Sequence, residues 1–263
     1  MSNFSTRVTT GFNGLDEILD GLRIGDNVVW RVDDISDYQY FVKPFIANAL
    51  KLRKKVVYFR FASHQPLIKP GNNVAIYELD AHRGFESFAT RIHTIITEQG
   101  PGAFYAFDCL SNLLSAWATD EMIGQFFRVT CPYLFELDTV AYFALLRGSH
   151  SDKTIYRIRE TTQVLLGVDN IAGDMIINPL KVWKRSSTTM FLPHIKKGDR
   201  FIPVADSSSA TRWLTSIYGK DTDDARRQLD YWDLLFLQAE DLASNPSAVD
   251  QQQKMVDQLC RVM

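Results

Sequence analysis

The stretch GDNVVWRVDDISDYQYF, from Gly25 to Phe41, decides the fold of this chain. Its apolar run at residues 28–30 predicts a buried strand, and the polar residues that follow predict a short loop leading into an amphipathic helix. This is the layout of a phosphate-binding loop, whose motif is G-x-x-x-x-G-K-[ST]. In that frame Val32 and Asp37 stand at the two glycine positions, Tyr38 at the lysine position and Gln39 at the hydroxyl position.

The loop lacks what holds a phosphate. Glycines let backbone N–H groups converge on an anion, but no glycine occurs between Asp26 and Arg60. The loop also carries three carboxylates, and each costs roughly 3 kcal/mol at about 5 Å from a phosphate charge. A helix N-terminus, worth about 0.3–1 kcal/mol, cannot offset them. We therefore expect no bound nucleotide, cofactor or metal, and no catalytic residue.

The same carboxylates, Asp33, Asp34 and Asp37, spell D-D-x-x-D. Such a motif can bind magnesium and diphosphate inside the helices of isoprenoid synthases. Here it follows a strand and opens a helix, where Asp and Ser are ordinary capping residues. We favour capping and keep metal–diphosphate binding as the alternative.

Composition limits the class of protein. The 263 residues suffice for one large domain or a domain with an extension, and 46% of them are hydrophobic. A net charge of −2 argues against a general binder of nucleic acid or of membrane surfaces. Cys109, Cys131 and Cys260 have no C-x-x-C spacing, and no apolar run is long enough to span a bilayer. We expect buried thiols and a cytoplasmic protein.

Up to about residue 146, strands and helices alternate. Near-continuous apolar strands between helices predict a parallel sheet covered on both faces. The expected strands are 28–32, 56–61, 74–79, 103–107 and 139–146. The expected helices are 15–22, 38–52 with a bend at Pro44, 84–98, and 121–137 with an interruption near Pro132.

The pattern then changes. Residues 162–168 and 175–183, joined by a polar turn at 169–174, predict an antiparallel hairpin. Short strands are expected at 190–194 and 200–204. From Asp221 the pattern is helical, and a second helix begins near Ser247. We expect residues 1–205 to form one domain and 206–263 a helical extension or linker. The first of these helices has an apolar stripe of Leu229, Trp232, Leu235, Phe236 and Leu242.

The opening TGFNGLDEILDGLRIGDNVVW resembles the start of KaiC-like domains of the RecA superfamily, where T-G-x-x-G-x-D-x-x-L precedes the phosphate loop. The matching residues are Thr10, Gly11, Gly14, Leu15, Asp16 and Leu19. The string YAFDCLSNLL is similar to the strand that ends in the magnesium-associated aspartate, which puts Asp108 in that role and Ser111 after it. Residues 161–184 look like the family's late hairpin. The resemblance implies a RecA-like three-layer sandwich with a mostly parallel central sheet.

The chain departs from this family at its catalytic parts. In KaiC-like ATPases the strand after the first helix leads to acidic residues that activate water, but here VVYFRF is followed by Ala62, Ser63 and His64. A carboxylate such as Asp108 needs a metal, and the metal needs phosphates. The resemblance thus implies a degenerate phosphate loop and a pseudo-ATPase.

A narrower resemblance is carried by VVYFRFASHQPL, GAFYAFDCLSNLL, TCPYLFELDTVAYFALLR and LKVWKRSSTTMFLPH. These strings look like the amino-terminal region of bacterial phosphoenolpyruvate synthase-like (PEP/pyruvate-binding) proteins. We expect a non-catalytic interaction or regulatory module whose partner is a protein or the downstream kinase domains. The alternative is an ATP-binding KaiC-like ATPase with an unorthodox loop, and a third reading is a ring-forming homo-oligomer.

Other residues have a structural and a functional interpretation. Tyr38 can fill the former nucleotide pocket, which predicts a closed site there. We favour Asp108 as a relic that caps the turn after its own strand. His64 and His194 lack metal-ligand spacing and are expected to be hydrogen-bonded surface or core residues. The basic residues Lys181, Lys184 and Arg185 are similar to a segment that reaches a neighbour's phosphates in KaiC-like rings, and we expect them to be solvated charges at a strand edge.

Overall fold

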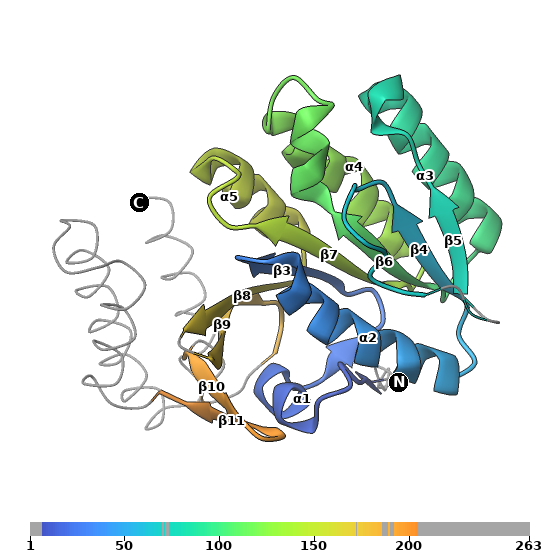
Figure 1. Ribbon diagram of the computed structural model, residues 1–263. Helices are drawn as coiled ribbons and strands as arrows, with labels where there is room; N and C mark the ends of the chain where they lie inside the picture. Colours follow the sequence, from blue (N-terminus) through green and yellow to red (C-terminus); the bar gives the residue numbers. More distant parts are fainter. Residues whose placement is uncertain are drawn as a thin grey trace, which may run out of the picture.

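The computed structural model describes residues 7–204, apart from residues 70, 72–73, 172, 186–188 and 190–191. This part of the chain is an α/β structure built on one nine-stranded sheet, with the order β11-β10-β9-β8-β3-β7-β6-β4-β5. Helices cover both faces of the sheet, which gives three layers (Figure 1). A small antiparallel pair, β1 (Arg7–Val8) and β2 (Leu22–Arg23), lies beside the large sheet.

The sheet has a parallel part and an antiparallel part. The six strands from β8 to β5 are parallel, and β9, β10 and β11 extend the sheet as antiparallel neighbours beyond β8. The parallel strands are β3 (Asn27–Val32), β4 (Val56–Arg60), β5 (Val74–Glu78), β6 (Phe104–Cys109), β7 (Val140–Leu146) and β8 (Val164–Ile171). The antiparallel ones are β9 (Asp174–Val182), β10 (His194–Lys197) and β11 (Arg200–Pro203).

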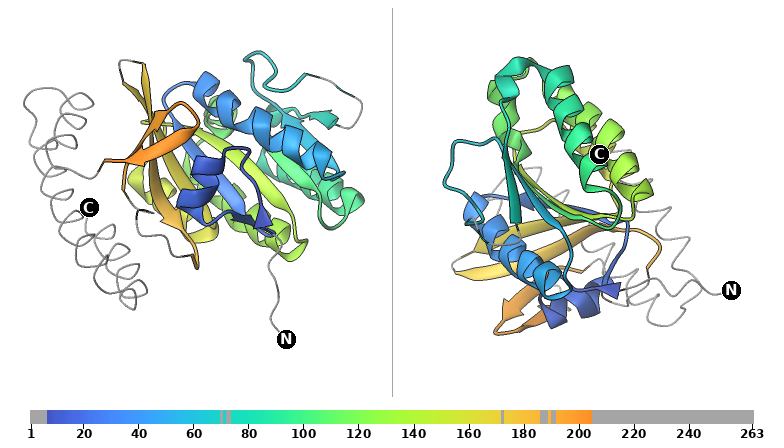
Figure 2. Two further views of the ribbon diagram at one scale, coloured as in Figure 1. Left: turned by 90° about the horizontal axis from the view of Figure 1, so that it is seen from below. Right: turned by 90° about the vertical axis from the view of Figure 1, so that its right-hand side faces the viewer.

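The helices are divided between the two faces. On one face lie α1 (Asn13–Leu19) and α2 (Ile35–Lys51), and on the other lie α3 (Phe85–Gln99), α4 (Glu121–Glu136) and α5 (Asp152–Thr161). The two views of Figure 2 show the same separation from below and from the side. Two short 3₁₀ helices, η1 (Ala81–Arg83) and η2 (Leu110–Ser115), lie in the connections.

Each face of the sheet has its own apolar core, because successive side chains of a strand point to opposite faces. In β3, Trp30 belongs to the core under α2 and Val29 to the core under α3 and α4. The α2 side is rich in stacked rings. Trp30 lies on Phe41 with 4.2 Å between centroids, and Phe45 lies on Tyr142 with 3.9 Å. Two buried faces explain why the strands read as continuous apolar runs.

The prediction of an α/β fold with a mostly parallel sheet and a late antiparallel hairpin is confirmed. Three details of the predicted helices were wrong: two boundaries and one interruption. The first helix ends at Leu19 because Asp20 adopts a left-handed conformation (φ 52°), and Leu22 pairs in β2. The second begins at Ile35, three residues before Tyr38. Pro132 lies inside α4, which the structure assigns as one helix without an interruption.

The late strands also differ from the expectation. The strands β8 and β9 continue through the region expected to be a polar turn, so Asp169 pairs with Ile176 inside the ladder. The strand expected to end at His194 begins there instead. Helix α5 was not expected at all. The expected helices at 221 and 247, the apolar stripe and the boundary at residue 205 lie outside the described residues.

Candidate functional site

The candidate site is the loop between β3 and α2 together with the ends of β6 and β7. The loop is short because Asp34 is already the N-cap of α2, where its carboxylate accepts the backbone N–H of Ser36 at 2.7 Å. Hydrogen bonds from Ser36 hold the pKa of Asp34 below its ordinary value. The capping interpretation of the D-D-x-x-D motif is therefore confirmed for Asp34.

Tyr38, at the lysine position, is fully buried in the first turns of α2. Its hydroxyl donates a hydrogen bond to the carbonyl oxygen of Phe107 at 3.1 Å. Burial above all, with the charge of Asp108 as a further cause, raises the pKa of the hydroxyl well above its ordinary value. Tyr38 is thus a neutral donor that fills the space between α2 and the end of β6.

Asp108 is completely buried at the end of β6. One carboxylate oxygen accepts the backbone N–H groups of Phe61 and Ala62, both at 3.0 Å. The other accepts the hydroxyl of Tyr58 and lies 3.8 Å from Nε2 of His64. Asp108 therefore caps the chain leaving β4, and the expectation that it caps the turn after its own strand was wrong.

A local irregularity of the sheet sets this geometry. The register of β6 against β7 shifts between Ala106 and Cys109, and such a bulge re-aims side chains at the end of a strand. Tyr58 completes the arrangement, because its hydroxyl also accepts the backbone N–H of Leu67 at 3.2 Å. Burial and the hydrogen bond to Asp108 raise the pKa of Tyr58 far above its ordinary value, so this hydroxyl stays protonated.

Arg147 pairs with one loop carboxylate, that of Asp33, and with Asp169 of β8. Nε of Arg147, just after β7, lies 2.9 Å from a carboxylate oxygen of Asp33, and its Nη2 atom lies 2.6 Å from a carboxylate oxygen of Asp169. The same guanidinium donates to the carbonyl oxygen of Val168 at 2.9 Å. Burial raises the pKa of Asp169 to about 6, and Arg147 offsets only part of that effect. Burial also raises the pKa of Asp37, which is itself nearly buried.

A serine–histidine pair lies at the same edge of the sheet. Oγ of Ser111 is 2.7 Å from Nε2 of His150 and accepts the backbone N–H of Leu146 at 2.8 Å. Ser111 is buried, and burial lowers the pKa of His150. The pair joins η2 to the end of β7. We assign the pair a structural role because it links these two connections.

The two histidines singled out by the sequence lie apart from each other. Nδ1 of His64 donates to the carbonyl oxygen of Gln65 at 2.8 Å. His194 is fully buried at the start of β10, and burial lowers its pKa to about 4, so it is neutral at pH 7. Among the described residues, no group of three or more His, Cys, Asp or Glu side chains could hold a metal ion.

Of the three basic residues Lys181, Lys184 and Arg185, two make hydrogen bonds or ion pairs within the fold. Arg185 is buried and its Nη2 atom pairs with Asp26, whose carboxylate also accepts the backbone N–H of Arg23 at 2.7 Å. Lys181 is half-buried and donates to the carbonyl oxygen of Arg159. Lys184 is exposed over the ring of Trp183, at 4.4 Å. The expectation of solvated charges was wrong for Arg185 and Lys181.

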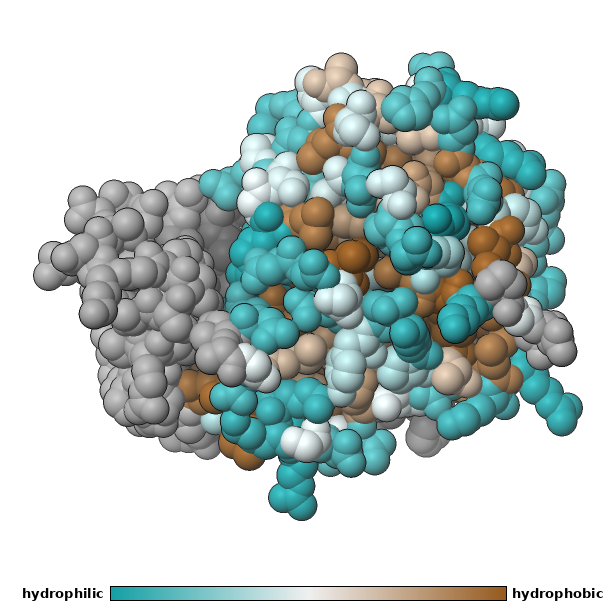
Figure 3. Space-filling model, viewed as in Figure 1, coloured by the Kyte–Doolittle hydropathy of each residue, from teal (hydrophilic) through white to brown (hydrophobic). Residues whose placement is uncertain are grey.

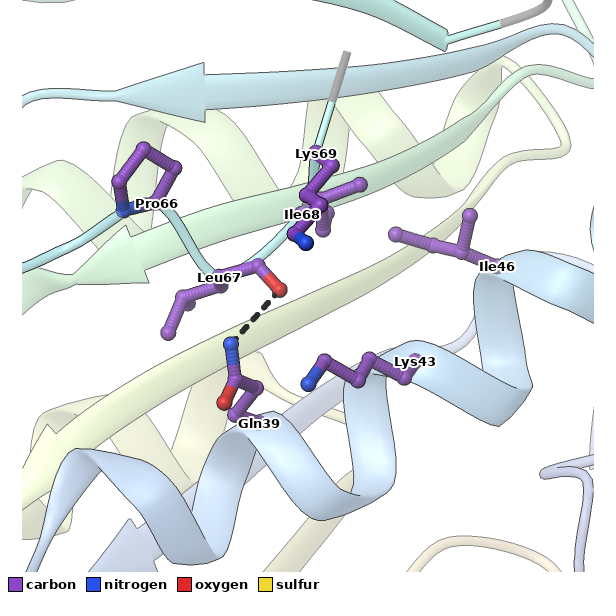
Figure 4. Close-up of a pocket in the computed structure, with 7 residues that line it drawn as sticks. All are labelled: Gln39, Lys43, Ile46, Pro66, Leu67, Ile68 and Lys69. Atoms are coloured by element: carbon purple, nitrogen blue, oxygen red, sulfur yellow. Dashed lines mark hydrogen bonds between the residues drawn. The ribbon is translucent and has the colours of Figure 1, made fainter. Parts of the chain in front are cut away.

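A pocket of about 350 Å³ lies between α2 and residues 66–69, which follow β4 (Figure 4). Gln39, at the hydroxyl position of the motif, faces it and donates to the carbonyl oxygen of Leu67 at 2.9 Å. Neither Tyr38 nor Asp108 lines this pocket. Its walls are Gln39, Lys43, Ile46, Pro66, Leu67, Ile68 and Lys69.

The structure thus brings Tyr38 and Asp108 together and places Val32, Asp37 and Gln39 around the same helix start. Sequence reasoning missed Tyr58 and Arg147. A positional signal existed only for Arg147, which lies just beyond the end of β7, whereas Tyr58 lies in the middle of β4. Within the part of the chain that the structure describes, no helix has the length and apolar character needed to cross a membrane.

Comparison with known proteins adds no assignment: no family model matches this chain, and no curated protein matches it either.

Proposed function

We propose that this chain carries a RecA/KaiC-like domain that has lost nucleotide binding and acts as an interaction or regulatory module. The observation that carries the proposal is the joint engagement of Tyr38 and Asp108. A side chain that fills the phosphate position and an aspartate already saturated by protein donors leave no groups for a metal–nucleotide complex. Two carboxylates near the same helix start, Asp33 and Asp37, add repulsion toward a triphosphate.

The family assignment is supported by topology. The loop that follows β3 opens α2, and the strand that ends in Asp108 is separated from β3 by one strand, β7. The late antiparallel hairpin of β8 and β9 continues the sheet on the other side of β3. These features are expected of a RecA-like domain, and we infer that the polypeptide descends from an ATPase.

The competing proposal is an ATP-binding domain with an unorthodox loop. The observation that favours ATP binding is Arg147, a cation close to the loop. Both acidic partners of Arg147 already neutralise it, because Asp33 and Asp169 lie within 2.9 Å and 2.6 Å of its guanidinium. A phosphate would have to displace both carboxylates, so we favour the module without nucleotide.

A thermal-shift titration with ATP and magnesium separates the two proposals. A ligand at one hundred times its Kd stabilises by about 2.7 kcal/mol. For a domain of this size such a gain raises the melting temperature by roughly 5–10 °C. We expect no shift at millimolar ATP, for the wild type and for Asp108→Asn alike. A saturable shift in the wild type that Asp108→Asn abolishes would establish the ATPase proposal.

We further propose that the partner is a phosphoenolpyruvate synthase-like kinase, cytoplasmic like this chain. An exposed aromatic pair offers a contact surface: Phe135 and Trp183 are 39% and 41% exposed and pack edge to face with centroids 6.0 Å apart. Large exposed aromatics are typical anchors of protein interfaces.

Mixing the full chain with such a kinase, while its phosphotransfer rate is measured, tests the partner. We expect a change in rate that the double variant Phe135→Ala/Trp183→Ala removes. Leu52→Ala is the matched control, since Leu52 is 53% exposed at the end of α2. No effect of the wild-type chain on the rate would reject this partner, whatever the nucleotide titration shows.

A further inference from the structure

The antiparallel end of the sheet presents an apolar row on one face. Ile176 of β9 pairs with Ile195 of β10, and Ile195 pairs with Ile202 of β11. Directly paired residues of antiparallel strands lie on the same face of a sheet. The three isoleucines therefore form one continuous row across the last three strands, which we name the isoleucine row.

The row lies on the face that carries α3, α4 and α5. The alternate residues Ile177 and Phe201 point to the opposite face, where Ile177 joins the core under α1 and α2 and Phe201 contacts Phe12. Leu165 of β8, on the same face as the row, belongs to the core under α3 and α4. The isoleucine row thus extends the α3–α5 face of the sheet.

The described helices leave the outer part of the row uncovered. The row contributes to neither of the two apolar clusters found among the described residues. Ile176 is buried, Ile195 is half-buried and Ile202 is 49% exposed. Figure 3 shows hydrophobic surface at the lower left, where Figure 1 places β10 and β11. An apolar row that runs out to an exposed isoleucine on the last strand of a sheet is a candidate docking face.

The chain itself supplies a candidate cover directly after β11. The segment after Val204 extends to residue 263, and its stripe of Leu229, Trp232, Leu235, Phe236 and Leu242 would occupy one side of a helix. The segment has ten acidic and six basic residues, and Arg200 lies on the same face as the isoleucine row. Lys197 lies on that face too and is already paired with Asp174 at 2.7 Å.

We propose that residues 229–242 form a helix that docks on the isoleucine row of the same chain and completes the helical layer beyond α5. The helix caps the open β11 edge, as a covering element does in sheets that avoid edge-to-edge pairing. The proposal is independent of the loss of nucleotide binding. It implies that the C-terminal segment is part of the folded domain and not a linker.

Hydrogen–deuterium exchange on the full chain tests this docking. Ile202→Asp places a charge on the row, and we expect amides of residues 229–242 to exchange about tenfold or more faster. Leu52→Asp is the matched control, because Leu52 is 53% exposed but lies at the end of α2, on the opposite face. We expect Leu52→Asp to leave the exchange rates of residues 229–242 unchanged. In Ile202→Asp, unchanged exchange in α2 reports an intact fold.

A second variant acts from the other side of the contact. Trp232→Ala should speed exchange in β10 and β11 without altering β3. The proposal is overturned if residues 229–242 exchange equally fast in the wild type and in Ile202→Asp, or if Leu52→Asp has the same effect. It is also overturned if the protection of this segment rises with protein concentration, because the occupant is then a second copy of the chain.

Discussion

The hydroxyl of Tyr38 donates a hydrogen bond to the carbonyl oxygen of Phe107, the residue that precedes Asp108. This bond joins the start of α2 to the end of β6, two elements that in a phosphate-binding site stand apart with the ligand between them. In this chain the uncharged ring of Tyr38 lies there, next to the carboxylate of Asp108, which already accepts three hydrogen bonds from the protein. These contacts contribute to the stability of the fold.

Truncating the hydroxyl of Tyr38 should destabilise the fold. In Tyr38→Phe the carbonyl of Phe107 loses its donor in a buried place, which costs about 1–3 kcal/mol. Tyr38→Ala also leaves a cavity and should cost roughly 3–5 kcal/mol. Urea unfolding measures both. Tyr40→Phe is the control, since Tyr40 is 38% exposed, and its free energy of unfolding should match the wild type. A Tyr38→Phe variant as stable as Tyr40→Phe would contradict the role of this bond.

Asp108 should behave as a structural cap. Asp108→Asn puts an amide N–H₂ group where a carboxylate oxygen accepts donors, so the free energy of unfolding should fall by about 2 kcal/mol or more. Asp34→Asn serves as the control because asparagine caps helices as well as aspartate does. Chemical denaturation of both variants tests this. Equal stability of Asp108→Asn and the wild type would show that the carboxylate is not needed for the fold.

Asp169 should make stability depend on pH. Its pKa is raised from 3.8 to about 6, so the folded state binds more protons than the unfolded state between these values. The stability that protonated Asp169 contributes is therefore fully present below pH 3.8. It is lost as the pH rises through 6, and the free energy of unfolding falls by roughly 3 kcal/mol in total. The charged groups acting on it, besides burial, are Arg147, Asp33, Arg31 and Asp37.

The measurement is the free energy of unfolding from pH 4 to pH 7 for the wild type and Asp169→Asn. We expect the variant to gain stability relative to the wild type as the pH rises over this range. Asp34→Asn should show the opposite sign in a lower range, because its pKa is lowered in the fold. A constant difference between the wild type and Asp169→Asn would contradict the prediction.

The buried pair of Arg185 and Asp26 allows a double-mutant cycle. Arg185→Met leaves Asp26 buried without its cation, which should cost about 3–5 kcal/mol. Adding Asp26→Asn removes the uncompensated charge, so the double variant should be more stable than Arg185→Met alone. Equilibrium unfolding of the four proteins gives the coupling energy. Additive effects would mean that the two side chains do not interact.

The parallel strands β3 to β7 could be predicted from the sequence because both faces of the sheet are buried there and the apolar runs are continuous. Helix α5 could not, because its ten residues carry few apolar side chains and only Thr154, Ile158 and Arg159 are buried. The end of α1 was missed because the left-handed Asp20, which is not a glycine, stops the helix before Leu22.

The site was predictable only in part. The substitution of Tyr38 for lysine is visible in the motif, and so is the position of Asp108 at a strand end. Their partners are not, since Tyr58 lies 50 residues before Asp108, and Arg147 lies 114 residues after Asp33. Only the order of strands in the sheet brings such distant residues to one edge.

The most direct test of the proposed loss of nucleotide binding is a crystal of the full chain soaked in millimolar magnesium and a non-hydrolysable ATP analogue. We predict unchanged positions for Tyr38 and Asp108 and no density for phosphate between them. Triphosphate density at the start of α2, with the ring of Tyr38 rotated out of its place beside Phe107, would contradict the account.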